Sequence, residues 1–247
     1  MANVPVILIH GFPLDKRMWA DVSHSLRLKT YAFDLPGAGR SHRDESPDDH
    51  SIAAYARSMM GVFAWLSAKQ AVFCGLSMGG YVVFEILRQF PDRVRAAILC
   101  NTKATPDTPE AKSARNALAA RVQGEGTSAL VDEMINRLVA RVTRERRPEI
   151  VRAVTQVISQ QNVPGMVGAL RALRDRADST PLLGQIRVPV LVIAGDDDQV
   201  TPAEGMREMA RAIPDAEFVL IPEAGHLSPI EQPNAVSAAI NDFLARL

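Results

Sequence analysis

Apolar residues gather along this chain in six short continuous runs, separated by segments of helical periodicity. The runs are rich in Val, Ile and Leu, which is typical of strands buried on both faces of a parallel sheet covered by helices. They span residues 4–9, 28–34, 71–74, 95–100, 188–194 and 216–221. The pattern predicts an open α/β sheet of about six strands, with a ligand site beyond the carboxyl ends of the strands.

Between these runs, apolar residues recur every three or four positions, as on the buried face of a helix. One such segment follows Ser51, a residue type favoured at helix N-caps, and another follows Pro233 near the end of the chain. Their apolar positions are Ile52, Tyr55, Met59, Val62, Phe63 and Leu66, and then Val236, Ile240, Phe243 and Leu244. Both segments are predicted to be amphipathic helices packed against the sheet.

The alternation stops between residues 101 and 187, where helical patterns occur without a strand pattern. One apolar stripe comprises Leu130, Met134, Ile135, Leu138 and Val142, and a second comprises Ile150, Val154, Val157 and Ile158. Because the segment leaves one strand and returns to the next, we expect a helical cap of residues 102–187 above the strand ends, inserted in a core of residues 1–101 and 188–247. Its arginines are predicted to face solvent: Arg137, Arg141, Arg144, Arg146 and Arg147.

The charge balance and the lengths of the apolar runs limit the kinds of partner that the protein can bind. The 247 residues include 28 basic and 28 acidic side chains, a formal net charge of zero. This balance argues against nucleic acid or an anionic membrane as a partner and favours a small neutral or apolar ligand. The apolar run at the start is too short to cross a bilayer and lacks a signal-peptide pattern, so a cytoplasmic protein is expected.

The two cysteines, Cys74 and Cys100, each end an apolar run and are predicted to be buried reduced thiols. No C-x-x-C or H-E-x-x-H pattern occurs, and the sequence gives no indication of a metal or cofactor.

The sequence CGLSMGGY, residues 74–81, places three glycines around Ser77. An apolar run precedes it and a helical pattern follows, so Ser77 is predicted to lie at a sharp turn between a strand and a helix. Such a turn tolerates only small neighbours, strains the serine backbone and exposes its Oγ. A glycine-rich turn without chemistry is the alternative, and a base and an acid are needed to decide between them.

A serine hydroxyl needs a base to accept its proton, and histidine suits that task near neutral pH. His226 lies in the loop PEAGHLSP after the last apolar run, on the carboxyl side of the predicted sheet, and is predicted to be this base. His10 ends the first run and is predicted to brace its loop rather than transfer protons. The remaining histidines have polar neighbours and are predicted to lie at the surface: His24, His42 and His50.

The imidazole in turn needs a buried acceptor that fixes its tautomer. Asp196, Asp197 and Asp198 follow the fifth run directly, and spacing alone does not choose among them. The other common place for the acid, after the run that ends at residue 100, holds Asn101, which favours the three aspartates.

Two backbone N–H groups are candidates for binding a developing oxyanion. Met78 begins the helix after Ser77, where N–H groups have no intrahelical partner. Gly11 permits a tight turn after the first run, so the Phe12 N–H is predicted to face the Met78 N–H.

Five segments in this order resemble the α/β-hydrolase superfamily over essentially the whole chain: HGFPLDKRMW, DLPGAGRS, GLSMGG, GDDDQVTP and AGHLSPIEQP. The resemblance implies that Ser77 is the nucleophile and His226 the general base. It selects Asp198 as the acid through the pattern G-x-x-D-x-x-T-P, and it implies that Phe12 and Met78 supply the oxyanion hole.

Within the superfamily, the chain is similar to small bacterial esterases and enol-lactonases with a four-helix cap. The similarity implies hydrolysis of a small-molecule ester or lactone without a cofactor, and a structural role for Asp34 in its loop. One departure is that only nine residues precede His10, where the family has an antiparallel strand pair. That pair is predicted to be shortened or absent, leaving a sheet edge available for a homodimer.

Other functions use the same fold and triad. They are C–C bond hydrolysis, hydroxynitrile cleavage and perhydrolysis, and, further away, a ligand receptor with slow turnover. The low aromatic content of 5% and the Ala- and Val-rich cap favour a small or aliphatic acyl group. The residues that bind the substrate and the oligomeric state are unknown from the sequence.

Overall fold

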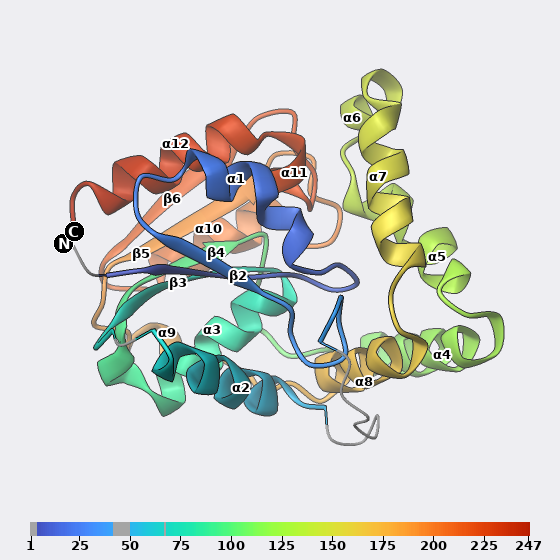
Figure 1. The fold of residues 1–247 in the computed structure, drawn as a ribbon, viewed down its shortest axis with the longest axis horizontal. Helices are drawn as coiled ribbons and strands as arrows, with labels where there is room; N and C mark the ends of the chain where they lie inside the picture. The colour runs from blue at the N-terminus through green and yellow to red at the C-terminus, as the bar shows by residue number, and fades with distance from the viewer. Residues whose placement is uncertain (1–3, 42–49, 67) are drawn as a thin grey trace.

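The computed structural model describes residues 4–41, 50–66 and 68–247. Its centre is a six-stranded sheet in the order β2-β1-β3-β4-β5-β6, in which every neighbouring pair is parallel (Figure 1). The strands are β1 (Val6–Ile9), β2 (Thr30–Phe33), β3 (Ala71–Leu76), β4 (Val94–Cys100), β5 (Val190–Gly195) and β6 (Ala216–Ile221). Each of the six apolar runs therefore coincides with a strand, although β3, β4 and β5 extend beyond the predicted runs, and the predicted α/β sheet is confirmed.

Helices cover both faces of this sheet. One face carries α1 (Ala20–Ser25), α11 (Ser228–Glu231) and α12 (Pro233–Leu244), and the other carries α2 (Ile52–Ala64) and α3 (Met78–Gln89) (Figure 1). The predicted N-cap forms, since the Ala54 N–H donates to Ser51 Oγ at 3.0 Å. α10 (Ala203–Arg211) packs against β5 and β6. The short 3-10 helices are η1 (Lys16–Trp19) and η3 (Pro91–Arg93).

The parallel register places the carboxyl ends of four strands side by side, along the side of the sheet where the strands end. Ile9 of β1 pairs with Gly75, Leu76 of β3 pairs with Cys100, and Cys100 pairs with Ile193 of β5. The loops that follow these strands therefore start side by side. The thiols of Cys74 and Cys100 lie below these strand ends, buried and free, with 4.0 Å between their Sγ atoms.

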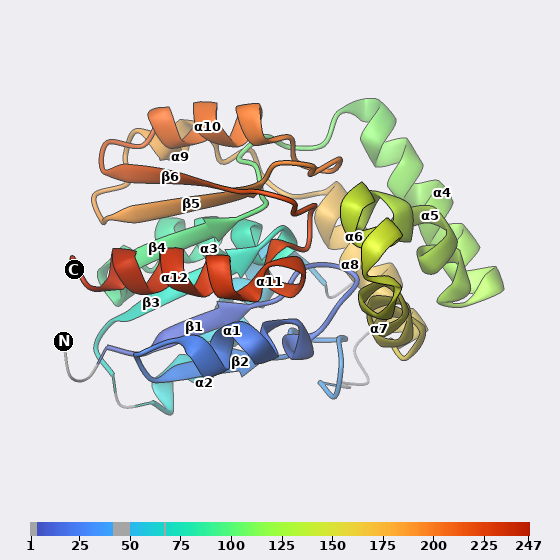
Figure 2. The same cartoon turned by 90° about the horizontal axis from the view of Figure 1, so that it is seen from above.

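Five helices between β4 and β5, here called the cap helices, gather at the carboxyl ends of the strands (Figure 2). They are α4 (Pro109–Glu125), α5 (Ser128–Leu138), α6 (Arg141–Arg146), α7 (Pro148–Ser159) and α8 (Val163–Arg174). The apolar stripe predicted over residues 130–142 is shared by two helices, because the backbone turns extended at Val139. α9 (Thr180–Leu183) lines a cavity together with α10 instead. The division into a core and a cap of residues 102–187 remains our proposal.

β2 forms one edge of the sheet and β6 the other. β1 lies inside the sheet, fully buried, and no strand precedes it in the described part of the chain. The half-buried rings of Tyr31 and Phe33 stack on edge strand β2 with 6.2 Å between their centroids. Pairing of this edge in a homodimer stays a prediction. None of the helices in the described ranges is long and apolar enough to cross a membrane.

Candidate active site

Ser77 lies at the turn between β3 and α3 with a backbone φ of 53° and ψ of −112°. A non-glycine residue rarely adopts this conformation, and neighbouring contacts hold it there. The Ser77 N–H donates to Cys100 O at 2.9 Å, and Thr102 Oγ1 donates to Ser77 O at 2.8 Å. The half-buried Ser77 hydroxyl contributes to a cavity of about 470 Å³. The predicted strained turn is thus present in the structure.

Glycines at this turn allow backbones to approach more closely than any side chain permits. A Cβ on Gly75 would lie 2.2 Å from Gly79 O, and a Cβ on Gly79 would lie 2.3 Å from Ile9 O. Because both obstacles are backbone atoms, rotation of a side chain cannot relieve the clash.

We expect Gly79→Ala to lower the free energy of unfolding by about 1–3 kcal/mol, since the added methyl forces α3 away from β1. Chemical denaturation of the purified protein measures this loss. Gly61→Ala in α2 is the control, because no atom beyond its chain neighbours and the adjacent backbone of its own helix lies within 4 Å of its Cβ position. That variant should be about 0.5–1 kcal/mol more stable than the parent. Equal stability of Gly79→Ala and the parent would contradict the close packing of the turn.

The three aspartates after β5 have three different partners. Asp196 Oδ1 accepts from Ala224 N at 3.2 Å, and Asp197 Oδ2 accepts from Arg141 N at 2.7 Å. Asp198 Oδ2 lies 2.9 Å from His226 Nδ1, and Asp198 Oδ1 lies 3.1 Å from it. Only Asp198 therefore faces the imidazole, as the resemblance implies.

The Asp198 carboxylate is buried and receives several hydrogen bonds besides that of His226. Asp198 Oδ1 accepts from Val200 N at 2.8 Å and from Thr201 N at 2.9 Å. Asp198 Oδ2 accepts from Thr201 Oγ1 at 2.6 Å and from Asn101 Nδ2 at 2.9 Å. Burial alone would raise the pKa of Asp198, but the facing imidazole and these hydrogen bonds hold the pKa well below its ordinary value. Asp198 is thus ionised at neutral pH.

His226 is 1% exposed and uses Nδ1 for Asp198, so Nε2 lies on the other side of the ring. His226 and Ser77 line the same cavity. No hydrogen bond joins the imidazole to Ser77 Oγ in the described residues. Such contacts are often long before substrate binds and shorten in the reacting complex.

The loop after β1 lies directly against the Ser77 turn. A Cβ on Gly11 would be 3.1 Å from Leu76 O and 3.3 Å from Ser77 Cβ, so only glycine permits this approach. Phe12 follows and lines the cavity with Ser77. Within the described ranges, the N–H groups of Phe12 and Met78 donate to no protein acceptor. Both are available as donors to a ligand oxygen.

His10 is fully buried beneath this loop, where its Nε2 accepts from Leu35 N at 2.9 Å and its Nδ1 lies 3.1 Å from Gly11 O. Burial lowers the pKa of His10, which keeps its ring neutral. Asp34 accepts from Lys16 N and Arg40 N. Both residues thus make the loop-bracing contacts expected of them.

The other histidines differ in outcome. His24 is exposed, as predicted, and His42 lies outside the described residues. The prediction that His50 lies at the surface is wrong. His50 is 8% exposed, because Gly37 and Gly168 leave room for its ring, and its Nδ1 lies 2.7 Å from the Tyr55 hydroxyl oxygen.

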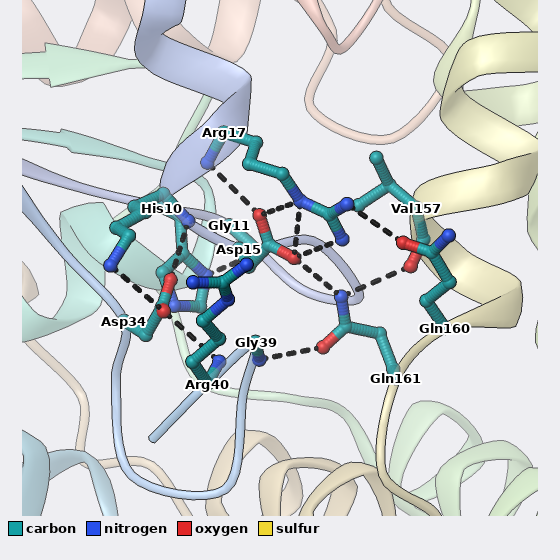
Figure 3. A network of polar contacts seen from close by, with 11 residues as sticks. His10, Gly11, Asp15, Arg17, Asp34, Gly39, Arg40, Val157, Gln160 and Gln161 are labelled. Atoms are coloured by element: carbon teal, nitrogen blue, oxygen red, sulfur yellow. Dashed lines mark hydrogen bonds and ion pairs between the residues drawn. The ribbon is translucent and has the colours of Figure 1, made fainter.

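A polar network joins the cap helices to the loop that contains Phe12 (Figure 3). Gln161 Nε2 donates to Asp15 Oδ2 at 2.9 Å, and Gly39 N donates to Gln161 Oε1 at 3.0 Å. Arg17, which also forms an ion pair with Asp15, donates to Gln160 Oε1 at 2.7 Å. The segment after α7 is therefore tied both to the loop that contains Phe12 and to the loop that contains Gly39.

Glu231 makes a second connection, at the loop of His226. Its Oε1 accepts from Gly225 N at 2.9 Å, and its Oε2 accepts from Ala140 N between α5 and α6 at 2.8 Å. Glu231 is fully buried, and burial raises its pKa despite these hydrogen bonds. Arg147 was predicted to face solvent, but it is half-buried and donates to Glu231 O at 2.6 Å. The hydrogen bond forms because Arg147, directly after α6, lies beside Glu231, the last residue of α11.

The cavity above Ser77 has an apolar part and a charged part. Its apolar residues include Phe12, Tyr81, Leu118, Met134, Leu173 and Val200. Its charged residues all come from the cap helices and the segment before them: Lys103, Asp107, Glu110, Arg115, Glu133 and Arg137. The cap therefore presents more charge to the cavity than its Ala- and Val-rich composition predicts.

Comparison with known proteins places this arrangement in context. A family model described as "alpha/beta hydrolase fold" matches residues 4–233. The 3-oxoadipate enol-lactonase 2 of Acinetobacter baylyi is 30% identical over 214 residues, which cover 87% of this chain and 78% of that protein.

Two solved structures extend the likeness to the whole fold. An esterase from Thermogutta terrifontis, determined with malate bound, is 40% identical, with a TM-score of 0.96 over 99% of this chain and 90% of that chain. The enol-lactonase from Burkholderia xenovorans LB400 is 30% identical, with a TM-score of 0.90 over 98% and 92%.

Proposed function

Because the chain belongs to the alpha/beta hydrolase family, we propose that it is a serine hydrolase that cleaves a carboxylic ester or lactone of a small molecule through an acyl-enzyme. Esterase and enol-lactonase relatives support a hydrolytic activity. The observation that carries the proposal is the buried Asp198–His226 pair, with 2.9 Å between Oδ2 and Nδ1, on the cavity that also contains Ser77.

In the proposed first step, Ser77 Oγ attacks the carbonyl carbon of the substrate while His226 Nε2 accepts the hydroxyl proton. Asp198 accepts a hydrogen bond from the Nδ1–H group of His226. This bond keeps Nε2 unprotonated before the attack and stabilises the imidazolium that forms during it. The carbonyl oxygen becomes negative and receives hydrogen bonds from the N–H groups of Phe12 and Met78.

The same groups then complete the cycle. His226 returns its proton to the leaving alkoxide, and Ser77 remains as an ester of the acyl group. A water molecule next attacks this ester while His226 accepts one water proton, and the histidine finally returns the proton to Ser77 Oγ. The products are a carboxylic acid and an alcohol, which are joined in one molecule when the substrate is a lactone.

The size of the cavity agrees with a small substrate. About 470 Å³ accommodates a compact ester or lactone and is at the low end of the range for small-molecule sites. Its apolar wall suits an aliphatic acyl group, and its charged wall suits a polar substituent.

A panel of p-nitrophenyl esters of graded acyl length, assayed beside simple lactones, tests this function. We expect turnover to be fastest with the shorter acyl groups and to be lost after treatment with a fluorophosphonate. Absence of turnover on every ester and lactone would contradict the proposal.

A second candidate keeps the triad and changes the bond that is cleaved. Charged cap residues on the cavity wall, such as Glu133 and Arg137, could stabilise charge away from the oxyanion hole, as C–C bond hydrolysis or cyanohydrin cleavage requires. Vinylogous diketones and cyanohydrins added to the panel separate these activities from ester hydrolysis. A single acylation by the fluorophosphonate without turnover of any compound would favour a slow-turnover receptor instead.

A further inference from the structure

Asn101 occupies the end of β4, at the strand edge that it shares with Ser77 and the three aspartates. It is fully buried, with a backbone φ of 44°, in the left-handed region. Asparagine tolerates this region better than most residues because its short polar side chain can bond locally. The proposed reaction gives Asn101 no step, yet its buried amide lies beside Asp198 on a backbone that few residues adopt.

The polar atoms of the Asn101 side chain have defined partners. Its Nδ2 donates to Asp198 Oδ2 at 2.9 Å and to Gly225 O at 3.2 Å, and its Oδ1 accepts from Ser228 Oγ at 2.6 Å. Because a carboxylate and a carbonyl only accept, the amide nitrogen has to face them. The hydroxyl of Ser228 occupies the opposite end and fixes that orientation.

These contacts form a chain of four buried side chains, and the backbone between His226 and Ser228 closes it into a ring. His226 contacts Asp198, Asp198 contacts Asn101, and Asn101 contacts Ser228, which lies two residues after His226 in the chain. Three strand ends are thereby connected through one amide. Movement of the Asp198 carboxylate toward solvent would break the Asn101 bond as well as the His226 bond.

We infer that Asn101 is a positioning residue that holds the Asp198 carboxylate against His226, with its own orientation set by Ser228. The inference rests on the proposed function, since positioning has a kinetic consequence only if His226 acts as the base.

The neutrality of the amide is part of this role. A carboxylate at position 101 would place a second negative charge about 3 Å from Asp198, and two buried carboxylates at such a distance share one proton instead of both ionising. Asn101 donates a hydrogen bond to Asp198 at every pH in the working range, whereas an aspartic acid could donate only while protonated.

The first experiment removes the side chain without straining the backbone. Glycine adopts positive φ at no steric cost, so Asn101→Gly deletes the amide alone. Loss of a hydrogen bond to a charged group should lower kcat on a short p-nitrophenyl ester by about ten- to a hundredfold, with little change in KM. Glu223→Gly is the matched control, because Glu223 is exposed and has a φ of 54°. Its kcat should equal that of the parent.

The second experiment introduces a titrating group. In Asn101→Asp, the shared proton leaves as the pH rises, and the hydrogen bond to Asp198 is then replaced by repulsion. We expect kcat of this variant to fall on the alkaline side of neutrality, where kcat of the parent stays level. A purely structural role for Asn101 would not produce this new alkaline limb.

The third experiment tests whether Ser228 orients the Asn101 amide, first with a substitution at position 228 alone. Ser228→Ala should lower kcat by roughly three- to tenfold, from the loss of one neutral hydrogen bond. The double variant Asn101→Gly/Ser228→Ala should be no slower than Asn101→Gly, because Ser228 acts through Asn101.

Three results would overturn the inference while leaving the proposed function intact. The first is a kcat of Asn101→Gly within twofold of that of an active parent. The others are a kcat of Asn101→Asp that does not fall at alkaline pH, and losses of kcat in the double variant that equal the product of the two single losses. Inactivity of the parent on every ester and lactone would instead mean that the proposed function has failed.

Discussion

Replacing Ser77 with alanine is expected to lower kcat for ester hydrolysis by about 10⁴-fold or more, because members of a catalytic triad act as a unit. The fold should survive, since the Ser77 hydroxyl makes no hydrogen bond to the described residues and the turn is held by backbone contacts. The Ser77 N–H to Cys100 O bond of 2.9 Å, for example, does not depend on the side chain. Initial rates on a short p-nitrophenyl ester, together with the thermal unfolding midpoint, measure both effects.

The control for this substitution is Ser113→Ala, on the exposed surface of α4, which should match the parent in rate and stability. Hydrolysis by Ser77→Ala at the parent rate, with an unchanged unfolding midpoint, would show that another group is the nucleophile.

Asp198→Asn should cost about 10³–10⁴-fold in kcat with a small effect on KM. The amide of the new side chain has one acceptor, whereas Asp198 accepts on both oxygens. Val200 N and Thr201 N donate to Oδ1, so they will keep the acceptor oxygen of the variant on their side. Its NH₂ group then faces His226 Nδ1, which must become the acceptor. The imidazole proton moves to Nε2, and the base that Ser77 needs is lost.

Asp197→Asn is the matched control, one residue away in the same loop. Its carboxylate accepts from Arg141 N and lies outside the cavity that contains Ser77. Its kcat should stay within a fewfold of the parent value. Equal losses in the two variants would assign the effect to the stability of the loop rather than to the partner of His226.

Much of the fold was predictable because its strands have an unambiguous pattern. Parallel strands buried on both faces need continuous apolar side chains, and each such run here coincides with a strand. The ends of these runs carry His10, Ser77, Asn101 and the three aspartates, so a parallel sheet places them at one edge. Order along the chain was sufficient to predict that edge.

The local sequence pattern could not predict which of the three aspartates contacts His226. Three adjacent carboxylates have identical chemistry, and their partners come from Arg141, Ala224 and His226, far away in the sequence. Only the resemblance to a family selected Asp198 beforehand.

Buried polar groups were the least predictable part. Polar neighbours in the sequence predicted an exposed His50, but glycines from other segments make space for it in the interior. No role could be predicted from the sequence for Gln161 or Glu231, although Glu231 lies within AGHLSPIEQP, because their hydrogen bonds join the cap helices to distant loops. The residues of the cavity wall depend on the same packing.

The central claim is that Ser77 carries the acyl group during turnover. Its most direct test is rapid acid quenching of the reaction with a slowly hydrolysed p-nitrophenyl ester, followed by mass spectrometry of the digested protein. The account predicts an added acyl mass on the peptide that contains Ser77, formed in step with the first burst of p-nitrophenol. Turnover of the ester with the acyl mass on another residue, or with no acylated peptide and no burst, would contradict it.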